Sequence, residues 1–103
     1  MLKTYPVCHP DTGVTRQVLS QQPELMVVSF GFEKGAKGAL HDHPHVQSTF
    51  VRAGRFEFTV GDETFKVGPG DSFVIPSGAR HGCTCLEPGE LIDTFTPRRD
   101  DFL

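Results

Sequence analysis

The stretch GAKGALHDHPHVQSTFVRAG, residues 35–54, carries most of the fold prediction for this 103-residue chain. Glycines bound the stretch, and three histidines gather at its centre. Residues two apart in an extended backbone point to the same side, so His41 and His43 can direct their imidazoles at one point. Gln47 follows after the break at Pro44. The stretch therefore predicts strand segments that bring three candidate metal ligands together.

A second stretch, GDSFVIPSGARHGCTC at residues 70–85, supplies one more histidine, His81. Imidazole nitrogens and amide oxygens are suitable donors for a divalent transition metal, and a fourth donor has to come from another strand. Nickel, manganese, iron, cobalt and zinc all suit such a donor set. The expected ligands of one divalent ion are His41, His43, Gln47 and His81.

The rest of the chain has a β-rich pattern. Eleven glycines and eight prolines separate short alternating runs of β-branched and aromatic residues, and no convincing helix is predicted. Gly61-Asp62 reads as a tight hairpin, because glycine supplies the positive φ that such turns need. Closely spaced antiparallel strands predict an all-β sandwich or barrel. Strands are expected over 14–19, 25–32, 48–52, 55–60, 63–67, 71–75, 82–86 and 91–95.

Composition indicates one globular domain, residues 1–103, with 37% hydrophobic and 22% charged residues. The net charge of −3, with no Lys/Arg run beyond Arg98 and Arg99, argues against nucleic acid and anionic membrane partners. No apolar run approaches the roughly 20 residues that span a bilayer, and no secretory leader is visible. Three cysteines cannot all pair within the chain, which favours the cytoplasm.

The two stretches resemble the two motifs of the cupin superfamily. Residues 35–54 follow G-x5-H-x-H-x3-Q-x6-G, with Gln47 where most members have Glu. Residues 70–85 follow G-x5-P-x-G-x2-H, with Cys85 in place of the usual Asn. This resemblance implies a cupin β-barrel, also called a double-stranded β-helix or jelly roll, with antiparallel strands. A neutral amide leaves the charge of a divalent ion uncompensated and favours a Lewis acid over an iron oxygenase.

Three further residues near these motifs are expected to have structural roles. His45 shares the parity of His41 and His43, but Pro44 turns the chain, so we expect a loop or supporting position for it rather than ligation. Cys83 and Cys85 share the parity of His81 and are expected to be small inward-facing wall residues.

The ending LIDTFTPRRDDFL, residues 91–103, is unusually polar for a final strand and tail. Asp93 and Phe95 alternate onto one face, and if that face lines the barrel they form a pocket with Arg99 at its rim. The alternative is a solvent-exposed Asp93 followed by a solvated charged tail.

With this ending, the chain is similar to the KdgF family of pectin degradation proteins. Its members are short cupins with a His, His, Gln, His metal set and a final Asp-x-Phe followed by Arg. The resemblance implies an enzyme that linearises 4,5-unsaturated monouronates from pectin or alginate to the ketone 4-deoxy-5-hexosulose uronate. It assigns catalytic roles to Asp93, Phe95 and Arg99, and Arg52 and Arg80 are weaker candidates for binding the substrate carboxylate.

Two other classes of function fit the same residues. One is a metal-dependent cupin dioxygenase or isomerase acting on another small acid, and the other is a non-catalytic protein that binds sugar acids. In each case the partner is a small molecule, and a homodimer formed through edge strands and the N-terminal segment is expected by analogy with small cupins.

Overall fold

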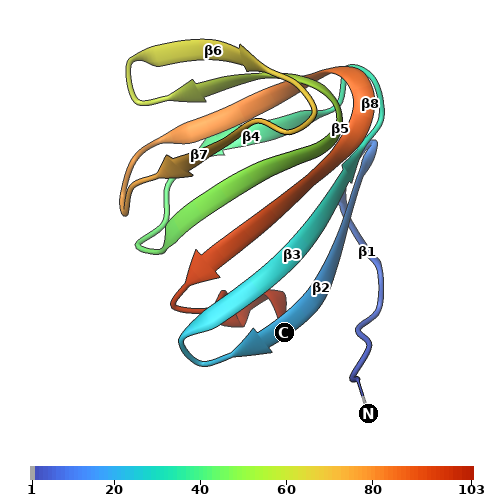
Figure 1. The fold of residues 1–103 in the computed structure, drawn as a ribbon, viewed down its shortest axis with the longest axis vertical. Helices are drawn as coiled ribbons and strands as arrows, with labels where there is room; N and C mark the ends of the chain where they lie inside the picture. Colours follow the sequence, from blue (N-terminus) through green and yellow to red (C-terminus); the bar gives the residue numbers. More distant parts are fainter. Residues whose placement is uncertain (1) are drawn as a thin grey trace.

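The computed structural model describes residues 2–103 and is built almost entirely from β-strands (Figure 1). Within this part of the chain the one helical element is the 3-10 turn η1 (Asp100–Phe102). No helix among these residues is long and apolar enough to cross a membrane. The all-β prediction is confirmed. The strands are β1 (Cys8–Asp11), β2 (Val14–Gln22), β3 (Leu25–Phe32), β4 (Lys37–His41), β5 (Val46–Val60), β6 (Glu63–Val67), β7 (Ser72–Ile75) and β8 (His81–Thr96).

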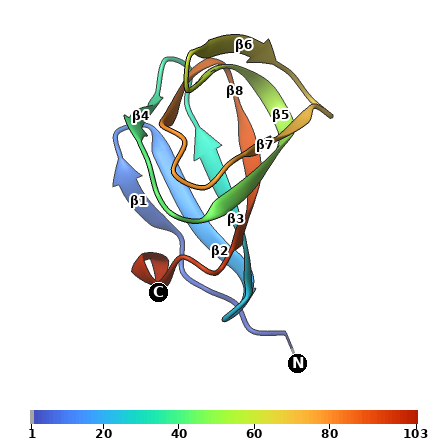
Figure 2. The same ribbon diagram turned by 90° about the vertical axis from the view of Figure 1, so that its left-hand side faces the viewer.

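The two long strands β5 and β8 pair with each other along almost their whole length and organise the jelly roll. The first part of β5 lies between β7 and the end of β8, whereas its second part lies between β6 and the start of β8. The strand order is β1-β2-β3-β8-β5-β6, with β4 on β8 and β7 on β5. Figures 1 and 2 show how both long strands curve, so that their two halves face each other across the interior.

Glycines make this curvature possible at the point where β5 crosses β8. Gly54 has φ +81°, and a Cβ there would lie 2.5 Å from the carbonyl oxygen of Glu87. A Cβ on Gly89 would collide with the carbonyl oxygen of Ala53. The predicted strands divide this region into 48–52 and 55–60, and divide the paired region into 82–86 and 91–95. That division was wrong, because these glycines bend paired strands without ending them.

For the shorter strands, the predicted bounds agree better with the structure. Strands 25–32 and 63–67 have the predicted bounds, and Gly61, with φ +57°, makes the predicted hairpin between β5 and β6. β1 and β4 were not predicted. β1 lies at the edge of the sheet, as expected for an N-terminal segment.

The apolar core fills one end of the barrel and continues as a smaller cluster at the other. Aromatic rings dominate the main cluster, with ring centroids 5.3 Å apart for Phe32 and Phe56 and 4.8 Å apart for Phe58 and Phe73. The smaller cluster consists of Val18, Met26, Val28 and Phe95. Between them the inward side chains become polar, and this is where the candidate site lies.

Candidate metal centre and its pocket

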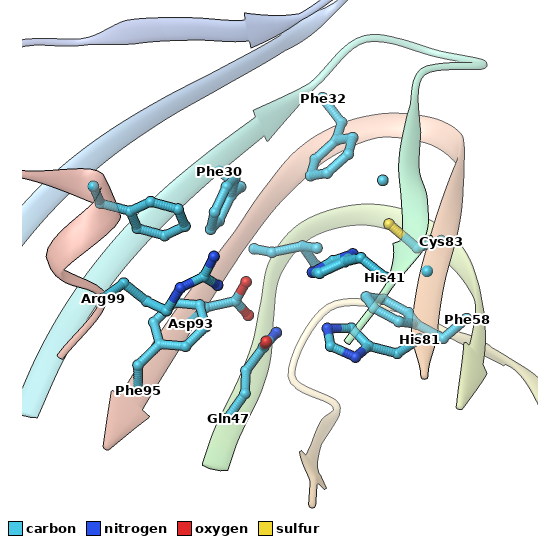
Figure 3. A pocket seen from close by; sticks show the side chains of 14 residues that line it. Phe30, Phe32, His41, Gln47, Phe58, His81, Cys83, Asp93, Phe95 and Arg99 are labelled. Carbon is cyan, nitrogen blue, oxygen red and sulfur yellow. The ribbon is translucent and has the colours of Figure 1, made fainter. Parts of the chain in front are cut away.

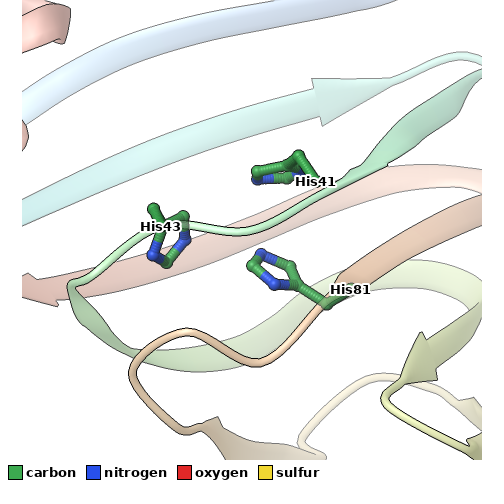
Figure 4. A group of neighbouring side chains, drawn as sticks. All are labelled: His41, His43 and His81. Atoms are coloured by element: carbon green, nitrogen blue, oxygen red, sulfur yellow. The ribbon is translucent and has the colours of Figure 1, made fainter.

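Three of the predicted ligands come together at the mouth of the barrel (Figure 4). His41 ends β4, His43 follows in the loop to β5, and His81 begins β8. The register between β4 and β8 places His41 directly opposite His81. One ring nitrogen from each histidine lies within 4.8 Å of the others, so these three side chains could hold a metal ion.

Backbone carbonyls fix the orientation of all three rings. In each case Nδ1 donates to a carbonyl oxygen two residues away, which leaves the lone pair of the neutral ring on Nε2. A second hydrogen bond of this kind is the usual support of a metal-bound histidine. The bonds run from His41 to Ala39, from His43 to His45 and from His81 to Ala79, over 2.7, 3.1 and 2.9 Å.

The Nε2 atoms are the ring nitrogens that remain for a ligand. Nε2 of His81 is buried and accepts no hydrogen bond, and Nε2 of His43 lies 3.0 Å from Oε1 of Gln47. With both Nδ1 atoms donating, each Nε2 has only a lone pair to offer, and a cation suits such a cluster. Burial is the main reason that the pKa values of His43 and His81 lie below the usual range, which favours neutral, metal-binding imidazoles.

A chain of hydrogen bonds connects this cluster to the carboxylate predicted in the pocket. The amide nitrogen of Gln47 donates to Thr49 Oγ1 at 3.0 Å, and Thr49 Oγ1 donates to Asp93 Oδ1 at 2.7 Å. Because the amide nitrogen is engaged by Thr49, Gln47 turns its oxygen toward His43. Sequence analysis missed Thr49, although its parity with Gln47 on β5 was the available signal.

Asp93 faces the interior and is only 4% exposed, so the alternative of a solvent-exposed carboxylate is wrong. Burial raises the pKa of Asp93 to about 7, against the opposing effects of hydrogen bonds from Thr49 and Gln47 and of the Arg99 charge. A carboxyl group in this range can both accept and donate a proton near neutral pH.

These residues border one cavity of about 200 Å³ (Figure 3). Its wall is mostly apolar and includes five phenylalanines, while the polar groups belong to His41, His81, Gln47, Asp93 and Arg99. Cys83 lines the cavity, whereas Cys85 is buried in the main core cluster. Burial raises the pKa of Cys83 to about 12, so this thiol stays protonated. The lining comprises Phe30, Phe32, Gly38, His41, Gln47, Phe58, His81, Gly82, Cys83, Leu91, Asp93, Phe95, Arg99 and Phe102.

Of the three arginines considered for binding a carboxylate, Arg99 lines the cavity, whereas Arg52 and Arg80 do not. The Arg99 guanidinium borders the cavity and points toward Asp93 in Figure 3. Arg52 forms an ion pair with Glu90, and Arg80 is an exposed residue of the loop before β8. Neither of them lines the cavity, so their proposed contact with a carboxylate there is wrong.

His45 lies beside the cluster of three histidines. Its ring is 5.4 Å from that of His43 and 6.4 Å from that of Phe95, while its carbonyl oxygen accepts the hydrogen bond from His43. The group of side chains that could hold a metal consists of His41, His43 and His81 without it.

The family model of the cupin domain matches residues 28–95, which run from β3 to the end of β8. The chain therefore belongs to the cupin family.

Three relatives give a finer similarity. The chain is 40% identical over 93 residues to the pectin degradation protein KdgF of Dickeya dadantii, covering 88% of this chain and 84% of the relative. The solved structure of KdgF from Halomonas sp. superposes with a TM-score of 0.92 at 39% identity, covering 96% of this chain and 94% of that one. An RmlC-like cupin from Shewanella frigidimarina gives the same TM-score and identity, covering 96% and 89%.

Proposed function

We propose that the protein is a metal-dependent enzyme that opens the ring of 4,5-unsaturated monouronates from pectin or alginate breakdown. The product is the linear ketone 4-deoxy-5-hexosulose uronate. Similarity to two KdgF proteins over most of the chain supports this reaction. The structural observation that carries the proposal is that Asp93, Arg99 and two of the clustered histidines, His41 and His81, border the same small cavity.

The reaction moves one proton and breaks one bond. In the cyclic substrate the ring oxygen joins the anomeric carbon to a C4=C5 double bond. Removal of the anomeric hydroxyl proton allows the bond between C1 and the ring oxygen to break, which leaves an aldehyde at C1 and an enolate at C5. Protonation at C4 then produces the ketone, so the product is an isomer of the substrate and atoms balance.

Asp93 is suited to both proton transfers. It is the buried carboxyl group among the residues lining the cavity, and its raised pKa of about 7 makes it an effective base and acid near neutral pH. We assign it the removal of the anomeric proton and the delivery of a proton to C4. The hydrogen bond from Thr49 holds carboxylate oxygen Oδ1 in a fixed position in the cavity wall.

The remaining polar and aromatic groups bind and orient the sugar. We assign to Arg99 the binding of the substrate carboxylate, because a guanidinium offers paired donors to two oxygens. Phe95, whose ring borders the cavity, is assigned to packing against the sugar ring.

The metal site of the proposal comprises His41, His43, Gln47 and His81. The lone pairs on the buried ring nitrogens and the orientation of the Gln47 amide support this donor set. A divalent ion held there supplies a Lewis acid for the negative charge that develops on substrate oxygen. The four donors are neutral, so the full charge of the ion is available for this purpose.

We further propose that the enzyme is a cytoplasmic homodimer. The free thiols of Cys8, Cys83 and Cys85 support a reducing compartment. β1 is exposed and ends the strand order, so its outer edge is available to a second copy. Analytical ultracentrifugation checks the dimer directly: a single species with the mass of one chain would exclude it.

Ultraviolet absorbance of the C4=C5 bond tests the reaction. Metal-loaded protein without oxygen is expected to accelerate the loss of absorbance of 4,5-unsaturated monogalacturonate, and a chelated sample is expected to match the spontaneous rate. Oxygen uptake during turnover would favour a dioxygenase, and binding without acceleration would favour a non-catalytic protein for sugar acids.

A further inference from the structure

Asp101 and Phe102 of the C-terminal turn η1, together with Phe95 of β8, hold the Arg99 side chain. Nε and Nη2 of Arg99 donate to the two carboxylate oxygens of Asp101, at 3.0 and 2.8 Å. The guanidinium carbon lies 4.2 Å from the centre of the Phe102 ring and 5.2 Å from that of Phe95. The Arg99 side chain is only 13% exposed as a result. An arginine that is fixed in this way loses little conformational entropy when it binds a ligand.

The donors that remain free lie on a different edge of the guanidinium. The group has five N–H donors, and Asp101 takes the edge formed by Nε and Nη2. The second edge, formed by Nη1 and the other hydrogen of Nη2, can still make a bidentate pair with another carboxylate. Arg99 borders the cavity and Asp101 does not, so the two edges serve different partners.

Two guanidinium groups and two phenyl rings contact the Phe102 side chain. The guanidinium of Arg16, on β2, lies 4.2 Å from its ring centre on one side, and that of Arg99 lies at the same distance. Its edge contacts are with Phe30 and Phe95, at centroid distances of 6.0 and 5.8 Å. The turn is therefore anchored to the barrel wall in spite of its charged sequence.

We propose that Asp101 is a positioning residue, which holds one edge of the Arg99 guanidinium so that the other edge receives the carboxylate of a uronate in the cavity. The inference rests on the proposed function and deepens it, because it assigns carboxylate recognition to a three-residue unit of Asp101, Phe102 and Arg99. A competing expectation is that Asp101 blocks Arg99, in which case its removal would improve binding.

The neighbouring ion pair provides a matched control. Arg98 donates from Nε to Asp100 at 2.7 Å in the same turn, but the Asp100 side chain is 80% exposed and neither residue borders the cavity. Asp100→Asn therefore removes a similar charge from the same turn without touching Arg99.

Steady-state kinetics of the metal-loaded enzyme tests the role of Asp101. Asp101→Asn is expected to raise KM for the unsaturated monouronate about tenfold, the effect of losing one charge-assisted contact, with kcat changed less than twofold. Asp101→Glu retains both carboxylate oxygens and is expected to recover most of the wild-type KM. Asp100→Asn is expected to leave KM unchanged. An unchanged or lower KM for Asp101→Asn would overturn the inference.

A binding measurement separates this inference from the proposed reaction. Calorimetric titration compares D-galacturonate with D-galactose, which lacks the carboxylate. The wild-type protein is expected to prefer the acid, and Asp101→Asn is expected to lose most of that preference while Asp100→Asn retains it. This result would uphold the role of Asp101 even if ring opening were not observed. Equal preference in wild type and Asp101→Asn would refute it.

Discussion

The two halves of β5 present opposite chemistry on the same face of one strand. Beyond the bend, Phe56 and Phe58 are buried in the apolar core. Before it, Gln47 and Thr49 are equally buried but polar, and each is held by hydrogen bonds. β8 repeats the contrast, with Cys85 in the core and Asp93 in the pocket. The comparison shows that the inward face of β5 changes from polar to apolar at the bend.

The largest effect is expected for Asp93→Asn in the polar half. Loss of a general acid and base lowers turnover about a hundredfold to ten-thousandfold. Because Asp93 is not among the expected ligands, metal content is expected to stay at the wild-type level. The absorbance assay and metal analysis on the same sample measure both quantities. Retained turnover would remove Asp93 from the proton transfers.

Phe56→Ala tests the apolar half in the same way. Removing a fully buried ring is expected to lower the free energy of unfolding by about 3–5 kcal/mol. KM and metal content measured well below the melting temperature are expected to be close to those of wild type. Urea unfolding supplies the stability measurement. A large change in KM in the folded variant would show that the two halves are coupled.

Thr49→Val breaks the chain of hydrogen bonds that connects Gln47 to Asp93. The variant has nearly the same shape but leaves the Gln47 amide and the Asp93 carboxylate without their common partner, at a cost of about 1–3 kcal/mol in stability. Metal affinity is expected to fall because the Gln47 oxygen loses its orientation. Ser48→Ala, exposed on the opposite face of β5, is the control. Equal metal affinity in both variants would argue against this account.

A smaller effect is expected on the pH dependence of stability in the metal-free protein. The folded-state pKa of Asp93, about 7, lies above the ordinary value of 3.8 for this carboxyl group, so the folded protein binds this proton more tightly than the unfolded chain. The stabilisation is present below pH 4 and is lost as the pH rises to 7. The melting temperature of Asp93→Asn relative to wild type is therefore expected to rise over this range. A constant difference would contradict the raised pKa.

The sequence predicted the parts of the site that depend on spacing and parity. His41, His43 and His81 come together as predicted, and the alternation that predicted an inward Asp93 agrees with its place in the cavity. Gly54 was misleading, because a glycine that bends a strand looks like one that ends it. The C-terminal turn was not foreseen, since two of the residues that contact Phe102, Phe30 and Arg16, are distant from it in the sequence.

The most direct test of the central claim is proton delivery to C4 of the substrate in D2O, followed by nuclear magnetic resonance. With metal-loaded wild-type protein, Asp93 on one side of the cavity is expected to place deuterium at a single one of the two C4 positions. The product of the spontaneous reaction serves as the reference. Deuterium distributed over both positions as in that reference would contradict enzymatic ring opening in this pocket.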